Sequence, residues 1–158
     1  MNSKGIAAIV APVLVAGFVA LTLSLSPGAA SVSASSGRDG QLHLAKECSQ
    51  YTGQPGGFCT FTYSNLRQID IGSKVFYDQA LGVPPGLVDS NVVLDAGNGD
   101  RAVGRCTLDL GTGRGLCTFS DGTGELSGFE ARVDVVCTNG GLNCTWDGPY
   151  KFNPQHRK

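Results

Sequence analysis

The stretch CTLDLGTGRGLCTFSDGTG, residues 106–124, contains one pattern twice, each copy running from a cysteine through a short alternating run to a Gly-Thr-Gly turn. The copies begin at Cys106 and Cys117, a period of 11 residues. Two such runs joined by a glycine turn are typical of a β-hairpin, and Gly111-Thr112 fits a two-residue type II′ turn, which requires glycine first. The stretch therefore predicts two antiparallel strands that reverse at this turn.

The register of this hairpin follows from its turn. If the chain reverses there, Asp109 lies opposite Arg114, which gives a cross-strand ion pair. The same register places Cys106 opposite Cys117, at a Cα separation that a disulfide can bridge. Because one register satisfies the turn, the charges and the cysteines, we expect a disulfide across this hairpin.

Apolar and polar residues also alternate in neighbouring segments. Three segments place apolar side chains on one face and polar ones on the other, as antiparallel strands with one solvent-exposed face do. The apolar faces are Cys106, Leu108 and Leu110; then Ala131, Val133, Val135 and Cys137; then Cys144, Trp146, Tyr150 and Phe152. From Phe58 onward such runs are broken by Gly, Asn, Asp and Pro, and none has a helical period. The pattern predicts an all-β barrel or sandwich.

The six cysteines predict a set of local disulfides. All lie after the N-terminal apolar run, and an even count in an exported chain indicates disulfides. Closing a short loop costs the least chain entropy, which favours pairing between sequence neighbours. The expected pairs are Cys48–Cys59, Cys106–Cys117 and Cys137–Cys144. No metal site is expected, because the chain has no Cys-x-x-Cys and its two histidines, His43 and His156, lie near opposite ends of the mature chain.

The N-terminus has the organisation of a secretory signal. An apolar run over 5–25 follows a single lysine and precedes a Ser-Pro-Gly break and a stretch of small residues. This pattern predicts a signal peptide over 1–34, cleaved near Ala30 or Ala34, and a secreted protein. The alternative is an uncleaved segment that anchors the protein, since an apolar run of this length can span a bilayer.

The mature chain has the size of one domain. We expect an N-terminal segment with the first disulfide over 35–57, a β-barrel domain over 58–153 and a polar tail over 154–158. Without Lys4 the chain carries 11 basic and 13 acidic side chains, a net charge of −2, with the signs interspersed. Such a surface gives no electrostatic footprint for nucleic acid, or for a membrane once the signal is removed.

Two glycine-rich stretches resemble ligand loops but are better explained as turns. DGTGELSG, 121–128, has Ser127 where a dinucleotide fingerprint needs its third glycine, and the chain lacks the lysine motif of a P-loop. We expect this stretch to connect two antiparallel strands, with Gly122 and Gly124 required by the backbone. DAGNGD, 95–100, has glycines where a calcium loop needs oxygen ligands, which favours a hairpin loop.

Two segments resemble allene oxide cyclases and dirigent proteins. TFSDGTGELSGFEARVDV, 118–135, is similar to the Gly-Gly-Thr/Ser-Gly-x-Phe-x-Gly signature near the C-terminus of these families and of their exported bacterial relatives. IDIGSKVFYDQAL, 69–81, is similar to an early strand segment of the cyclases. The resemblance extends over about 65–152 and implies a closed, eight-stranded antiparallel barrel with an apolar cavity. It also implies a homo-oligomer, since the plant members are often trimeric, and no cofactor.

The resemblance does not supply a catalytic residue. In these families, carboxylates and other polar side chains of the pocket steer a reactive epoxide or radical partners. The glutamates of the mature chain are Glu47, Glu125 and Glu130. None lies in the segment 58–63, which we expect to form the first inward-facing strand. Asp78 and Asp95 each end a strand next to a turn, and we expect both to be solvated.

Two functions from different classes fit these observations. The first is a barrel that binds a small apolar molecule and steers its reaction as an isomerase or cyclase would. Its candidate cavity residues have apolar bodies and polar tips: Tyr63, Tyr77, Trp146 and Tyr150. The second is an extracellular structural or interaction protein in which the same aromatics fill the interior. An open apolar interior would favour the first function, and a filled interior would favour the second.

Overall fold

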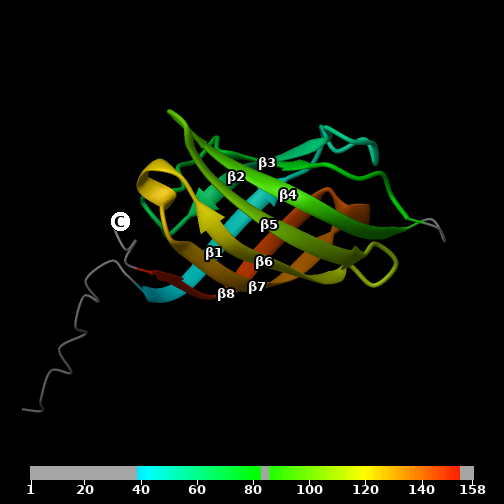
Figure 1. Ribbon diagram of the computed structural model, residues 1–158. Coiled ribbons are helices and arrows are strands. Elements are labelled where there is room, and N and C mark those ends of the chain that lie inside the picture. The colour runs from blue at the N-terminus through cyan, green and yellow to red at the C-terminus, as the bar shows by residue number, and fades with distance from the viewer. Residues whose placement is uncertain (1–38, 83–85, 154–158) are drawn as a thin grey trace, which may run out of the picture. The chain divides into compact units, whose positions relative to one another are not determined.

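Eight antiparallel strands pair in chain order and close into a barrel, with β1 against β8 (Figure 1). The computed structural model describes residues 39–82 and 86–153. The strands are β1 (Asp39–Glu47), β2 (Phe58–Ser64), β3 (Lys74–Tyr77), β4 (Leu87–Gly97), β5 (Asp100–Asp109), β6 (Arg114–Gly122), β7 (Phe129–Thr138) and β8 (Asn143–Phe152). Two single-turn 3-10 helices, η1 (Gly124–Leu126) and η2 (Asn139–Gly141), lie in the last two connections. The predicted fold class is confirmed.

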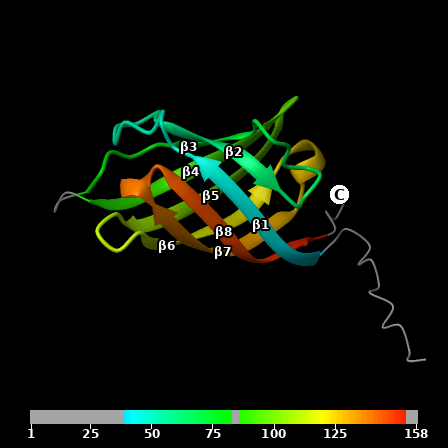
Figure 2. The ribbon, with the colours of Figure 1, turned by 180° about the vertical axis from the view of Figure 1, so that it is seen from behind.

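The barrel begins earlier in the chain than we expected. Residues 39–47 were predicted to precede the barrel, but they form β1, which lies between β2 and β8 (Figure 2). This strand is needed because without it the edges of β2 and β8 would present unpaired backbone groups. The predicted signal peptide, 1–34, and the tail, 154–158, lie outside the described residues. Neither helix in the described part of the chain is long or apolar enough to cross a membrane.

The barrel interior is filled by aromatic and aliphatic side chains. Trp146, Phe61 and Phe129 are the largest side chains that are fully buried. The Trp146 ring centroid lies 5.3 Å from that of Phe61 and 5.6 Å from that of Phe119, within the range of favourable aromatic pairs. The middle of the barrel is therefore a packed core, and the space left inside it is small.

Three disulfides join neighbouring strands or strand ends, as predicted. Their Cα separations are 4.2 Å for Cys48–Cys59, 4.1 Å for Cys106–Cys117 and 4.0 Å for Cys137–Cys144. The last two pairs are direct cross-strand neighbours, in β5–β6 and β7–β8. All six cysteines point into the barrel and are buried.

The β5–β6 turn has the predicted register but a different conformation. Asp109 pairs with Arg114 as expected, yet the positive φ belongs to Gly113, at +67°, and not to Gly111. The Asp109 carboxylate accepts hydrogen bonds from the amides of Gly111 and Thr112, at 2.7 and 3.3 Å. The type II′ assignment was therefore wrong. The aspartate forms an Asx turn that lengthens the loop, and its carboxylate is used there instead of in the expected ion pair, which does not form between these two described residues.

Replacing Gly113 by alanine is expected to destabilise the barrel by roughly 2–4 kcal/mol. The alanine would have to keep the left-handed backbone conformation of Gly113, and its Cβ would lie 2.4 Å from the carbonyl oxygen of Cys137. The matched control is Gly111→Ala in the same turn, whose Cβ would approach only the Asp109 side chain, at 3.1 Å. Chemical denaturation of both variants measures the difference. Equal midpoints for Gly113→Ala and wild type would contradict this account of the turn.

The DGTGELSG stretch connects β6 to β7, as predicted, and contains η1. Gly124 has φ of +60°, and Asp100 Oδ1 accepts a hydrogen bond from the Glu125 amide at 3.0 Å. Gly124→Ala is expected to cost about 1 kcal/mol or more, because its Cβ would be strained and would displace this carboxylate. The exposed Glu125→Ala change is expected to stay within about 0.5 kcal/mol. A thermal melt in which Glu125→Ala is the less stable variant would refute this assignment.

Candidate functional site at the disulfide end of the barrel

The four predicted cavity residues do not lie together. Tyr77 and Trp146 are buried in the interior, but Tyr63 is 54% exposed and lies on the outer surface. The prediction for Tyr63 was wrong because β2 contains a bulge. Lys46 pairs with Phe61 and Ala45 pairs with Tyr63, so one extra residue of β2 reverses the alternation before Tyr63.

Tyr150 lies in a different part of the barrel from Tyr77. Its ring is half-buried and packs near Phe129 and Phe152, with centroids 6.3 and 6.0 Å away. It lines an open depression of about 660 Å³ formed by β1, β6, β7 and β8, to which Tyr77 and Trp146 do not contribute. Of the predicted set, only Tyr77 and Trp146 share one environment.

The side chain that Tyr77 and Trp146 share is Lys46, which the sequence analysis did not identify. Lys46 lies on the inward face of β1 and is 4% exposed. Its Nζ donates a hydrogen bond to Tyr77 Oη at 2.5 Å and lies 4.4 Å from the centroid of the Trp146 ring. The sequence did contain an indication of this position. Every second residue from Leu42 to Cys48 lies on one face of the strand, and that face is apolar except for Lys46, so its side chain is expected to point into the barrel.

Among the residues that the structure describes, no carboxylate balances this amine. The buried polar side chains of the described residues are Lys46, Ser73 and Ser90. Asp78 is exposed, and Asp95 forms an ion pair with Arg101 at 3.2 Å on the outer surface. Asp78 is therefore solvated, as expected, whereas Asp95 is half-buried and paired with Arg101. Within the described ranges, no three acidic, histidine or cysteine side chains gather as metal ligands would.

Burial without a counter-charge shifts the acid–base behaviour of the site. Desolvation lowers the pKa of Lys46 to about 7, because water no longer solvates the ammonium form. Burial and the neighbouring Tyr51 raise the pKa of Tyr77, and burial raises the pKa of Tyr51. At mildly alkaline pH the interior therefore holds a neutral amine next to a phenol that keeps its proton.

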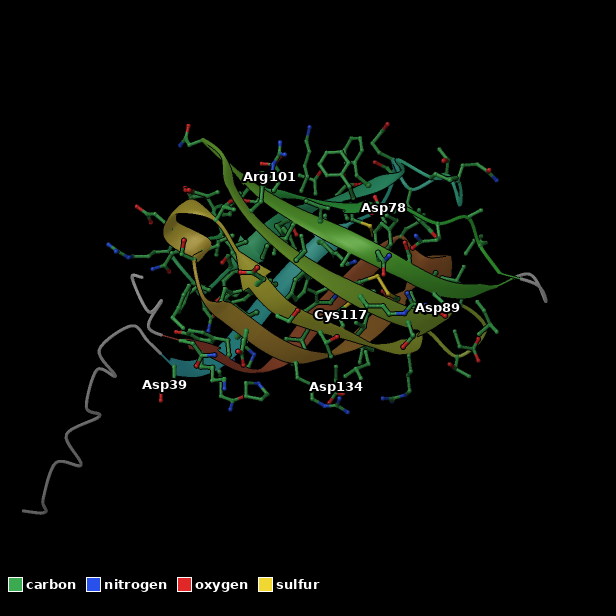
Figure 3. All side chains as sticks on the ribbon, in the orientation of Figure 1. Asp39, Asp78, Asp89, Arg101, Cys117 and Asp134 are labelled. Atoms are coloured by element: carbon green, nitrogen blue, oxygen red, sulfur yellow. A yellow bond between two sulfur atoms is a disulfide. The ribbon has the colours of Figure 1, made fainter. Side chains whose placement is uncertain are left out.

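A small cavity adjoins this pair. Its volume is about 20 Å³, which is enough for about one water molecule. Lys46, Tyr51, Tyr77 and Thr107 are its polar lining residues, and cysteines of all three disulfides line its walls. Figure 3 shows the yellow disulfide sulfurs inside the barrel, near Cys117. Tyr51 Oη has no hydrogen-bond partner among the described residues. The cavity is thus a mostly apolar chamber whose polar lining includes one amine and two phenols.

The fold and this chamber together define a small, disulfide-stapled antiparallel barrel with a lysine amine in its interior. Comparisons of the chain with protein-family models, with curated proteins and with solved structures find no match. The chamber is therefore the feature that points to a function.

Proposed function

We propose that this protein binds one small polar molecule at the disulfide end of its barrel, against Lys46 and Tyr77. The observation that carries the proposal is a buried lysine, 4% exposed, with no acidic partner among the described residues. An unpaired buried amine opposes folding, and perturbed groups of this kind cluster at functional sites. Lys46 has three possible hydrogen-bond positions at Nζ, but only Tyr77 Oη occupies one of them in the described structure.

The size of the chamber changes the ligand that we expected. Sites for drug-sized apolar molecules enclose roughly 300–1,000 Å³, whereas this chamber encloses about 20 Å³. The atoms that enter it must be few, and they meet an amine and two phenol groups. A small molecule with an oxygen or nitrogen head group fits these constraints better than a bulky apolar molecule does.

The resemblance to allene oxide cyclases and dirigent proteins supports this proposal only in its architecture. A closed eight-stranded barrel is what the resemblance implies, and we propose such a relationship. The described interior carries an amine, whereas those families use carboxylates to steer a reaction. We therefore propose binding at this site without carrying over their chemistry.

We also propose that the protein is exported. Three disulfides in a chain of this size are typical of an oxidising compartment. The apolar N-terminal run adds the signal that such a route requires. Intact-mass measurement of the protein from the culture medium tests both points, since cleavage near Ala30 or Ala34 predicts two specific masses. Protein found only in the membrane fraction at full length would favour the anchored alternative.

A second candidate is an extracellular structural or interaction protein with a filled barrel. The packed aromatic core and the small chamber favour it. It leaves the uncompensated lysine unexplained, because an apolar side chain would fill the same space at lower free energy. We therefore rank it below ligand binding.

A thermal-shift screen separates the two candidates. The screen uses small aldehydes, ketones, alcohols and carboxylates on wild type, Lys46→Met and the control Lys74→Met, which removes an exposed lysine of β3. Ligand binding predicts at least one compound that stabilises wild type and Lys74→Met but not Lys46→Met. A shift of equal size in all three proteins, or no shift with any compound, would favour the filled structural barrel.

A further inference from the structure

Lys46 has the surroundings of a nucleophilic amine. Its Nζ donates a hydrogen bond to Tyr77 Oη at 2.5 Å. This one phenol therefore positions the amine and lies close enough to exchange protons with it. The chamber walls are mostly disulfides, leucines and valines, which keep bulk water away from the nitrogen. Lysines desolvated in apolar pockets are the residues that attack carbonyl groups in enzymes, because the neutral amine has a free electron pair.

We propose that Lys46 forms an imine with a small, unbranched aldehyde, with Tyr77 as the proton-transfer group. This inference rests on the proposed function, since it names the ligand class of the same site. The lowered pKa of the amine supports it, because a large fraction of Lys46 is unprotonated at neutral pH.

The reaction needs only the groups present in the chamber. The electron pair of Lys46 Nζ bonds to the carbonyl carbon, and the carbonyl oxygen takes the Tyr77 proton while Nζ returns one proton to Tyr77. This gives a carbinolamine. Its carbon–oxygen bond then breaks, the hydroxyl leaves as water with the Tyr77 proton, and the remaining Nζ proton restores the phenol. Amine and aldehyde are converted to imine and water, with no change in oxidation state.

The shape of the chamber limits the aldehyde. A carbonyl oxygen needs about the space of the one water molecule that 20 Å³ can hold. Tyr51, Leu108 and Leu110 line the chamber and are only half-buried, so its outer wall lies at the protein surface. On this proposal a straight alkyl chain extends outward between these side chains, whereas a carbon branched next to the carbonyl is excluded.

Reductive trapping tests the inference. The folded protein is treated at pH 7.5 with propanal and sodium cyanoborohydride, which reduces an imine to a stable propyl amine, and peptide mass spectrometry follows Lys46 and the exposed Lys74 and Lys151 of the same chain. We expect Lys46 to be propylated at least about tenfold faster than the exposed lysines. The basis is that a lysine in water is neutral in about one molecule in a thousand at this pH, while partial enclosure slows entry to Lys46.

Two comparisons make the result specific. Tyr77→Phe keeps the ring but removes the phenol, and is expected to slow labelling of Lys46 at least about fivefold without changing that of Lys74. Replacing propanal by 2,2-dimethylpropanal is expected to spare Lys46 while still labelling Lys74. Circular dichroism and thiol titration on the same samples establish that the barrel and disulfides are intact.

Three outcomes overturn the inference. They are an unlabelled Lys46 in folded protein whose Lys74 is labelled, equal rates for Lys46 and Lys74, and labelling of Lys46 only at denaturant concentrations that unfold the barrel. If Lys46 remains unlabelled but a compound in the thermal-shift screen requires Lys46, imine formation fails and the proposed binding function survives. If neither experiment gives a Lys46-dependent signal, both proposals fail.

Discussion

Reduction of the three disulfides is expected to unfold the barrel at 37 °C. The bridges close loops of 11, 11 and 7 residues, and chain-entropy estimates for loops of this length are about 2–3 kcal/mol each. Their sum, about 8 kcal/mol, is comparable to the whole stability of a typical small domain. Trp146 is fully buried, so its fluorescence reports the loss of the core when a phosphine reductant is added.

Removing one bridge at a time provides the control. Replacing Cys106 and Cys117 together by serine is expected to lower the free energy of unfolding by about 2–4 kcal/mol, with a cooperative transition retained. A fully reduced protein with the same melting temperature as the oxidised one would show that the strand pairing and the aromatic core suffice without the bridges.

Lys46→Met is expected to stabilise the protein at neutral pH and to remove a pH dependence. The unfolded lysine has a pKa near 10.4, whereas burial lowers that of the folded state to about 7. Between these values the unfolded state binds more protons, so wild-type stability rises with pH by up to about 1.4 kcal/mol per unit. Methionine lacks this penalty, so its advantage is largest at pH 7 and below and decreases toward pH 9.

The net gain for Lys46→Met at pH 7 is expected to be about 1–3 kcal/mol, because the variant leaves the Tyr77 hydroxyl without its partner. The other titratable groups that line the chamber among the described residues are the buried Tyr77 and the half-buried Tyr51. Both are phenols with raised pKa values, so neither reverses the trend between pH 6 and 9. Denaturant unfolding at several pH values measures it, with Lys74→Met as control. A stability difference between Lys46→Met and wild type that does not change with pH would contradict a buried, desolvated amine.

The sequence predicted what depends on local pairing. The position of the turn and the spacing of the cysteines predicted the register of β5 and β6, which places Cys106 against Cys117. The turn conformation was missed because Asp109 has two uses, as a cross-strand ion partner and as an acceptor for turn amides. The shorter-range hydrogen bonds of the turn prevail in the structure.

The candidate site was harder to predict because it depends on contacts between distant strands. Tyr63 was misplaced by a bulge that only the pairing of β1 with β2 creates. Lys46 was missed because β1 was not recognised as a barrel strand, although its alternation with Leu42 and Leu44 was readable. Tyr77 was identified as an aromatic lining residue, but its role as partner of Lys46 joins residues 31 positions apart.

The most direct test of the account is the protonation state of Lys46. In protein carrying ¹⁵N-labelled lysine, the side-chain resonance of Lys46, assigned by its loss in Lys46→Met, is followed by NMR between pH 5 and pH 10.5. Burial among described residues that supply no counter-charge predicts a titration midpoint at about pH 7. A midpoint near 10.4, the ordinary value for lysine in water, would show that Lys46 remains solvated or paired, and would contradict both the proposed binding site and the imine chemistry.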